Sequence, residues 1–430
     1  MDTRRFLKAK IVDLAARTRR LARVDHANVG IRPQDLPYAP SAAHFSAANR
    51  RLAKIEDEVQ RRFGELMHGW RNAAPSRLLI DIALVERELD RARRTFGLFF
   101  EVFAQRGTTF AAALAAHDVI AGDCYVAVRE AAPHIFSGPL LEPLSYMEHG
   151  YSLATTRRGK VLKRLLGEPI PFPVIRIPWD REHPWQATFL HEVAHNLQAD
   201  LGIWQENQQA VLTRTMQAGR DPGLARTYAL WHKEIFADLA ALLLGGPAAA
   251  WNLAEFLAHP VPRVLTFRPG AVHPTTYLRI LILAEMLRRM GFTNEATQIG
   301  DVWRNLYDPS LSHRLPERLL ASAPRIIPEI VDEIAYQTRR NLAHRALVDV
   351  IPFRREDEEA ICASARLLVQ GRIDQVQLAP RHLVSAASYA LASGKVEPHR
   401  LSQQIIGRLT DPASRRRDRR ARSGLLAQAA

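Results

Sequence analysis

The sequence predicts a mainly α-helical protein of the α+β class with one small β-sheet. Long segments in which apolar residues recur every three or four positions dominate the chain and indicate amphipathic helices. Only one short apolar run, residues 173–178, is typical of a strand. Hydrophobic residues make up 47% and charged residues 24% of the 430 residues, so the chain can bury a core and its length indicates more than one packed unit.

In the amino-terminal region, 1–131, the spacing predicts long helices over residues 45–70 and 76–105. Ser76 is the expected N-cap of the second helix, and Gly107 its expected stop. Four phenylalanines near its end are expected to lie in the core, not in a ligand site: Phe96, Phe99, Phe100 and Phe103.

The middle region, 132–310, begins with a proline-rich stretch that contains the strand candidate. Because Pro173 and Pro178 bound this strand, it is predicted to lie at a sheet edge. Helices then resume, and the last region, 311–430, is expected to be a small helical appendage with a basic tail. The predicted helices cover 185–200, 205–218, 226–246, 275–290, 293–306 and, after prolines 316, 324 and 328, 329–346.

The net charge of +14 is concentrated near the two ends. Residues 1–30 hold eight Lys/Arg and three Asp (8 − 3 = +5), and residues 415–422 hold six Arg and one Asp (6 − 1 = +5). Such segments could contact nucleic acid or another anionic surface, although solvated helix faces are the plainer interpretation. Two cysteines exclude a disulfide framework or a thiolate metal cluster, and the absence of a long apolar run predicts no membrane span and a cytoplasmic location.

The motif that indicates chemistry is His191-Glu192-Val-Ala-His195. Two histidines four positions apart on a helix project from one face, so both imidazoles can bind one zinc ion. Glu192 stands beside the first ligand, where its carboxylate can act on a water molecule instead of the metal. Roughly 0.03 such motifs would arise by chance in a chain of this composition.

A second pair of residues supplies the missing ligand. Glu234 and Asp238 are also four apart, in a segment whose neighbours are mostly apolar. A buried carboxylate needs a cation, so we expect Glu234 to bind the metal and Asp238 to accept the outer N–H of a ligand histidine. The alternative is two surface acids on an amphipathic helix.

Candidates for stabilising the oxyanion of a hydrolytic reaction follow at a predicted helix start. In order of preference they are His273, Tyr277 and Arg279, with His273 as cap and Pro274 in the first turn. The alternative interpretation is a structural cap and a salt-bridging arginine. This His-Pro-x-x-x-x-Arg segment faintly resembles one in bacterial phage-exclusion peptidases.

The two motifs together resemble the gluzincin branch of the zincin metallopeptidases, the thermolysin-like group, over residues 173–246. The resemblance implies a zincin-like core in the middle region, with zinc bound by His191, His195 and Glu234. It implies that Glu192 is the general base and that Asp238 orients His191. In this family a strand beside the active-site helix pairs with the substrate backbone, a role that 173–178 could fill.

The sequence therefore predicts a zinc metallopeptidase with one zinc per chain and a peptide or protein substrate. Two alternatives from other classes remain. One is a catalytically silent, metal-binding regulatory protein, against which the presence of Glu192 argues; the other is a helical protein that binds nucleic acid through its basic ends. The chain has no phosphate-binding loop and no Gly-x-Ser-x-Gly, so nucleotide-dependent and serine-hydrolase chemistry lack support.

Overall fold

A computed structural model describes residues 2–21, 23–136, 140–148, 150, 153–156, 169–179, 181, 183–311 and 314–411. It is 71% helical with a small three-stranded mixed sheet, which confirms the predicted fold class. The chain divides into two compact units, one of Met1–Ala111 with Thr156–Val174 and the other of Ala112–Thr155 with Ile175–Ala430. The basic tail predicted at 415–422 lies outside the described residues.

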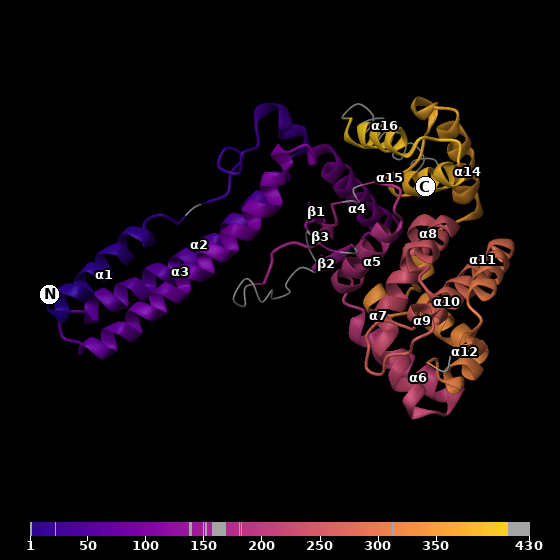
Figure 1. Cartoon of the computed structure of the whole chain (residues 1–430), viewed down its shortest axis with the longest axis horizontal. Helices are drawn as coiled ribbons and strands as arrows, with labels where there is room; N and C mark the ends of the chain where they lie inside the picture. Colours follow the sequence, from indigo (N-terminus) through magenta and orange to yellow (C-terminus); the bar gives the residue numbers. More distant parts are fainter. Residues whose placement is uncertain are drawn as a thin grey trace. The chain divides into compact units, whose positions relative to one another are not determined.

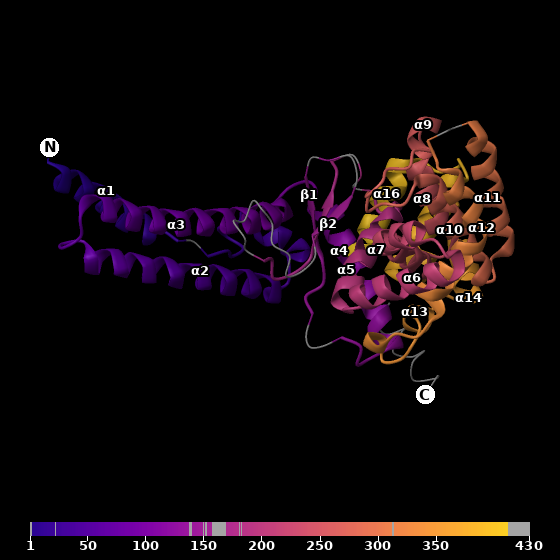
Figure 2. The ribbon, with the colours of Figure 1, turned by 90° about the horizontal axis from the view of Figure 1, so that it is seen from below.

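The first unit is built on three helices that lie side by side: α1 (Thr3–Thr18), α2 (Ala42–Gly69) and α3 (Pro75–Ala104) (Figures 1 and 2). Apolar residues from all three helices form one buried seam, as their spacing predicts; its members include Leu7, Ile11, Leu14, Ile55, Val59, Ile82 and Val85.

Two details of the predicted helix over 76–105 are wrong. The helix begins at Pro75 after Ala74, because proline fits the first turn, where its missing N–H has no partner to lose; Ser76 is therefore inside the helix. Phe99 and Phe103 are buried and pack near Phe172, whereas Phe100 is 41% exposed.

The sheet comprises β1 (Leu144–Met147), β2 (Ala154–Thr156) and β3 (Val174–Ile177), in the order β1-β3-β2. The predicted strand is thus the central one, not an edge. Pro173 and Pro178 stand just outside its four paired residues, so they remove no hydrogen bond from the ladder. Because β3 has a strand on each side, it offers no free edge for pairing with a substrate, and that expectation is wrong.

The second unit packs its helices around α7, which contacts α5, α6, α8 and α10 (Figure 1). Its elements are α4 (Ala111–Ala131), α5 (Thr188–Asp200), α6 (Trp204–Gly219), α7 (Pro222–Gly245), α8 (Pro247–Leu257), α9 (Val261–Val264), α10 (Thr276–Arg289), α11 (Thr293–Leu306), α12 (Glu317–Val331), α13 (Leu347–Val350), α14 (Arg355–Val369), α15 (Pro380–Ala392) and α16 (Pro398–Thr410).

Helix α12 replaces the helix predicted at 329–346. It continues through Pro324 and Pro328, although each proline removes one backbone donor. Its buried face, which includes Leu319, Ile326 and Ile330, packs against α6 and α10, and this burial outweighs the lost hydrogen bonds. A π-helical segment, Asp332–Tyr336, follows α12 directly, and beyond it the chain forms an isolated bridge between Arg339 and Arg345.

Within the described residues, one helix, α4, is long and apolar enough to cross a membrane, judged by length and composition alone. Buried core helices pass the same test, and 78% of its most apolar window is buried. Two of its three acidic groups make contacts inside the second unit: Asp118 accepts from the Ser145 N–H at 2.7 Å, and Asp123 pairs with Arg381 at 3.0 Å.

Candidate metal centre

Helix α5 carries both histidines on one face. They are one turn apart, and their rings meet edge to face at a centroid distance of 4.6 Å. Apolar residues on the remaining faces of the helix, such as Leu190 and Val193, are buried and hold the helix in place. The hydroxyl of Thr155 on β2 donates to Oδ1 of Asn196 at 3.0 Å, so α5 is also tied to the sheet.

Helix α7 supplies the carboxylates. It starts at Pro222 because the Asp221 side chain accepts from the backbone N–H groups of Gly223 and Leu224, a strong N-cap. From Tyr228 onward nearly every side chain is buried, and Glu234 and Asp238 lie in this buried part, exposed by only 9% and 1%.

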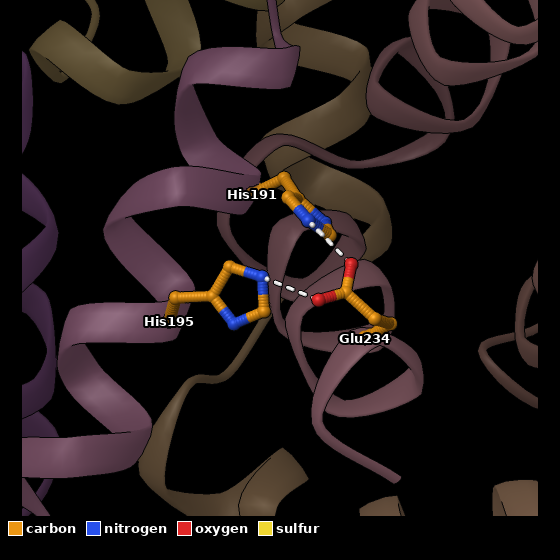
Figure 3. A group of neighbouring side chains, drawn as sticks. All are labelled: His191, His195 and Glu234. Carbon is orange, nitrogen blue, oxygen red and sulfur yellow. Dashed lines mark ion pairs between the residues drawn. The ribbon is translucent and has the colours of Figure 1, made fainter. Parts of the chain in front are cut away.

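The two helices bring His191, His195 and Glu234 together (Figure 3). Nε2 of His191 lies 3.4 Å from Oε2 of Glu234, and Nε2 of His195 lies 3.3 Å from Oε1. Two ligands placed at about 2.0–2.1 Å around a tetrahedral ion are about 3.3 Å apart. The donor set therefore suits a metal ion, and one donor atom from each residue lies within 4.8 Å of the other two, so this buried group could hold one.

Behind the three ligands lies a second layer of charge. Asp238 Oδ1 is 2.8 Å from Nδ1 of His191, the ring nitrogen that faces away from Glu234. Arg279 on α10 donates to both oxygens of Asp238, at 2.7 and 2.8 Å, and its Nη2 is 3.7 Å from Oε2 of Glu234. Asp238 thus lies against the outer ring nitrogen of His191, and Arg279 binds Asp238.

The ionisation of the group follows from these contacts. Burial favours the neutral form of His191, but Asp238 and Glu234 outweigh it and raise its pKa to about 9. Burial lowers the pKa of His195. Although burial disfavours their charged forms, neighbouring histidines and, for Asp238, Arg279 hold the pKa values of Glu234 and Asp238 well below their usual range. When His191 is neutral, as a metal ligand must be, the two carboxylates exceed the charge of Arg279 by one negative charge, which a cation can balance.

Glu192 remains partly exposed at the edge of this group. Its charge acts on both His195 and Arg279, which places it within electrostatic reach of the ligands. It is not one of the three residues whose donor atoms converge. Glu192 thus lies beside the group without being one of its candidate ligands.

His273 is the one oxyanion candidate that is both near the ligands and exposed. Its Nε2 lies 3.6 Å from Oε2 of Glu234, and its side chain is 65% exposed. The loop that carries it is tied to α7, because Nε1 of Trp231 donates to the Ala271 carbonyl at 3.1 Å. His273 does not cap α10, which begins three residues later, at Thr276, with Thr275 as the N-cap.

Tyr277 does not join the site. It is 4% exposed, and burial raises its pKa next to Arg304 and Asp308, which are not residues of the ligand group. Tyr277 and Arg279 are two positions apart on α10, so they point to opposite sides of the helix. Since Arg279 faces the ligands, Tyr277 cannot.

Arg279 was the third oxyanion candidate and, alternatively, a salt-bridging arginine behind the ligands with Asp238; it is buried and bound to Asp238, as the alternative expects. One contact was missed. The Trp231 tether had no signal, because its partner is a backbone carbonyl. Comparison of the chain with protein-family models, curated proteins and solved structures finds no match.

Proposed function

We propose that this protein is a zinc-dependent metallopeptidase of the gluzincin type. The observation that carries the proposal is the buried His191–His195–Glu234 group, with Asp238 on the outer nitrogen of His191. Two imidazoles and one carboxylate form a ligand set that catalytic zinc sites use, because it leaves a position open for chemistry. A purely structural zinc site would instead be closed by four protein ligands.

Bound zinc would supply a Lewis acid for a peptide carbonyl and make a water molecule acidic enough to react near neutral pH. Glu192 would take the proton from the attacking water and return it to the leaving amine. His273, exposed and 3.6 Å from Glu234, would donate to the oxygen that gains charge. Asp238 and Arg279 would hold His191 in the orientation that leaves Nε2 facing the metal.

The test compares Glu192→Gln with Glu234→Ala. We expect Glu192→Gln to retain about one zinc per chain, measured by elemental analysis, and to lose at least about 100-fold of its hydrolysis of a quenched fluorescent casein. Glu234→Ala should lose the zinc as well, because it removes a ligand. Unchanged hydrolysis by Glu192→Gln, or well-folded wild type that takes up no zinc, would contradict the proposal.

A further inference from the structure

We propose that the tip of the first unit binds the surface of an anionic lipid bilayer. The tip comprises residues 2–8, at the start of α1, and residues 67–81, which hold the end of α2, the turn and the start of α3. The two segments lie at the same end of the three-helix bundle (Figures 1 and 2), where Nη1 of Arg4 donates to the Arg71 carbonyl at 2.8 Å. None of the candidate metal ligands belongs to the tip, so the inference goes beyond the proposed hydrolysis and does not depend on it.

The tip exposes large apolar side chains that the core does not use. Its 22 residues hold four of the twelve large apolar side chains that are exposed within the described part of the chain: Phe6, Met67, Leu79 and Ile80. Each is between 45% and 55% exposed. Leu78 and Ile82 are four apart and face the apolar seam, so Leu79 and Ile80 between them point away from it. Such a concentration of exposed apolar side chains indicates a contact surface.

The same tip is cationic. It holds five Lys/Arg and two Asp (5 − 2 = +3). One of the two acids, Asp81, is paired with Arg77 at 3.1 Å, and the other caps α1. Arg5, Lys8 and Arg71 are exposed, and none of them makes an ion pair with a residue that the structure describes. Three cations of the tip are therefore left for an external anion.

Exposed apolar side chains beside unpaired cations match an anionic bilayer. The apolar groups gain by entering the boundary between headgroups and acyl chains, and each nearby cation adds attraction to the anionic headgroups. Trp70, which is partly buried against the seam, is of a residue type enriched at that boundary.

Other partners match the tip less well. A nucleic acid would use the cations but would leave Leu79 and Ile80 in water. A second copy of the tip would bring like charges together. Solvated helix faces, the plainer interpretation of the basic ends, account for the cations but not for the exposed apolar side chains beside them.

The proposed contact is peripheral. It does not involve α4, which lies in the second unit and has 78% of its most apolar window buried. Because the cations of the tip are exposed, salt screens their attraction to lipid headgroups. Binding should therefore be reversible and should depend on both the lipid charge and the salt concentration.

The experiment measures co-sedimentation of the full-length protein with lipid vesicles. We expect binding to vesicles of phosphatidylcholine with about 30% phosphatidylglycerol, and at least about tenfold weaker binding to vesicles of phosphatidylcholine alone. Raising the salt concentration from about 0.1 M to about 0.5 M should weaken binding to the anionic vesicles about tenfold. No binding to the anionic vesicles, or equal binding to both kinds, would overturn the proposal.

Variants assign the binding to the tip, since the basic segment 415–422 could also attract anionic lipid. Leu79→Gln combined with Ile80→Gln removes apolar groups without changing the charge and should weaken binding about tenfold. The matched control is Phe100→Gln, near the other end of α3, where the side chain is 41% exposed and binding should not change.

A second pair of variants tests the cations. Arg5→Gln combined with Lys8→Gln should weaken binding to the anionic vesicles about tenfold. Arg93→Gln combined with Arg94→Gln makes the same change in net charge farther along α3 and should weaken binding less. All these positions are exposed, so circular dichroism should be the same in every variant. Wild-type binding by both tip variants would place the lipid contact elsewhere and overturn the proposal. So would binding of duplex DNA, but not of vesicles, that the loss of Arg5 and Lys8 weakens and the loss of Leu79 and Ile80 does not.

Discussion

Charged residues of α3 and of the candidate metal centre make ion pairs of the same length in very different surroundings. Arg94 Nε lies 2.7 Å from Oδ2 of Asp90 on α3, with side chains 45% and 29% exposed. Arg279 Nε also lies 2.7 Å from Oδ2 of Asp238, but these side chains are 9% and 1% exposed. The length of an ion pair therefore does not determine how much the pair contributes to stability. Its exposure does, because water solvates an exposed charge and makes it less dependent on its partner.

Exposed pairs contribute about 0–1 kcal/mol, since water solvates either partner when the other is removed. In a buried pair, loss of one partner leaves the other charge without solvent or counter-charge, which costs about 3–5 kcal/mol. The first unit contains many pairs of the exposed kind, such as Arg61 with Glu58. Its apolar seam must therefore supply most of its stability.

The largest expected effect is that of Asp238→Ala. It leaves the buried Arg279 guanidinium and Nδ1 of His191 without their common partner, so the free energy of unfolding should fall by about 3–5 kcal/mol. The measurement is urea denaturation in the presence of a chelator, so that metal binding does not contribute. The matched control is Asp90→Ala, which should cost less than about 1 kcal/mol. Equal losses of unfolding free energy in the two variants would show that burial does not determine what an ion pair contributes to stability.

The next effect tests the seam of the first unit. Ile55 on α2 is 0% exposed, so Ile55→Ala removes apolar contacts and leaves a cavity, at a cost of about 2–5 kcal/mol. Leu79→Ala on α3 is the control, because that side chain is 48% exposed and should cost little. Denaturation followed by circular dichroism would show both. If Leu79→Ala cost as much as Ile55→Ala, the seam would not be the source of the stability.

The smallest expected effect concerns a buried carboxylate without an ion pair. Glu358 on α14 accepts from the Tyr389 hydroxyl at 2.7 Å, and no cation bridges it among the described residues. Burial raises the pKa of its carboxyl, only partly offset by Tyr389 and Cys362. Its contribution to stability is therefore complete below the ordinary carboxyl pKa of about 4.3 and is lost as the pH rises through the folded-state value.

Glu358→Gln cannot titrate and lacks this pH dependence. Between about pH 4 and pH 7, the wild type should lose stability relative to the variant as the pH rises. Asp238 shows the opposite behaviour, since Arg279 and His191 hold its pKa low. Parallel stability curves for wild type and Glu358→Gln would show that burial of this carboxyl has no energetic consequence.

The candidate site could be predicted from the sequence where its members share a helix. His191 with His195, and Glu234 with Asp238, are each four apart, and helical geometry alone places each pair on one face. The contact between the pairs required the docking of α5 on α7, which no local pattern encodes. Tyr277 was chosen by its distance along the chain from His273, whereas the rotation of α10 sends it to the other side.

For the fold, too, local patterns were predictable and tertiary contacts were not. The seam helices α2 and α3 follow from their own periodicity, within a few residues. The place of β3 in the sheet was wrong because β1 and β2 are short strands in segments with no clear pattern. Helix α12 was missed because the tertiary burial of its face outweighs the local signal of Pro324 and Pro328.

The way the site is assembled has a consequence for folding. Arg279 and His191 meet across 88 residues of sequence. Closure of such loops carries an entropic cost, so α5, α7 and α10 must dock before the side chains of His191, Glu234, Asp238 and Arg279 meet. In the unfolded chain those groups are separate and solvated, and they offer no common site. A cation that binds only the docked helices would therefore stabilise the native state, and this stabilisation would grow with the logarithm of the cation concentration.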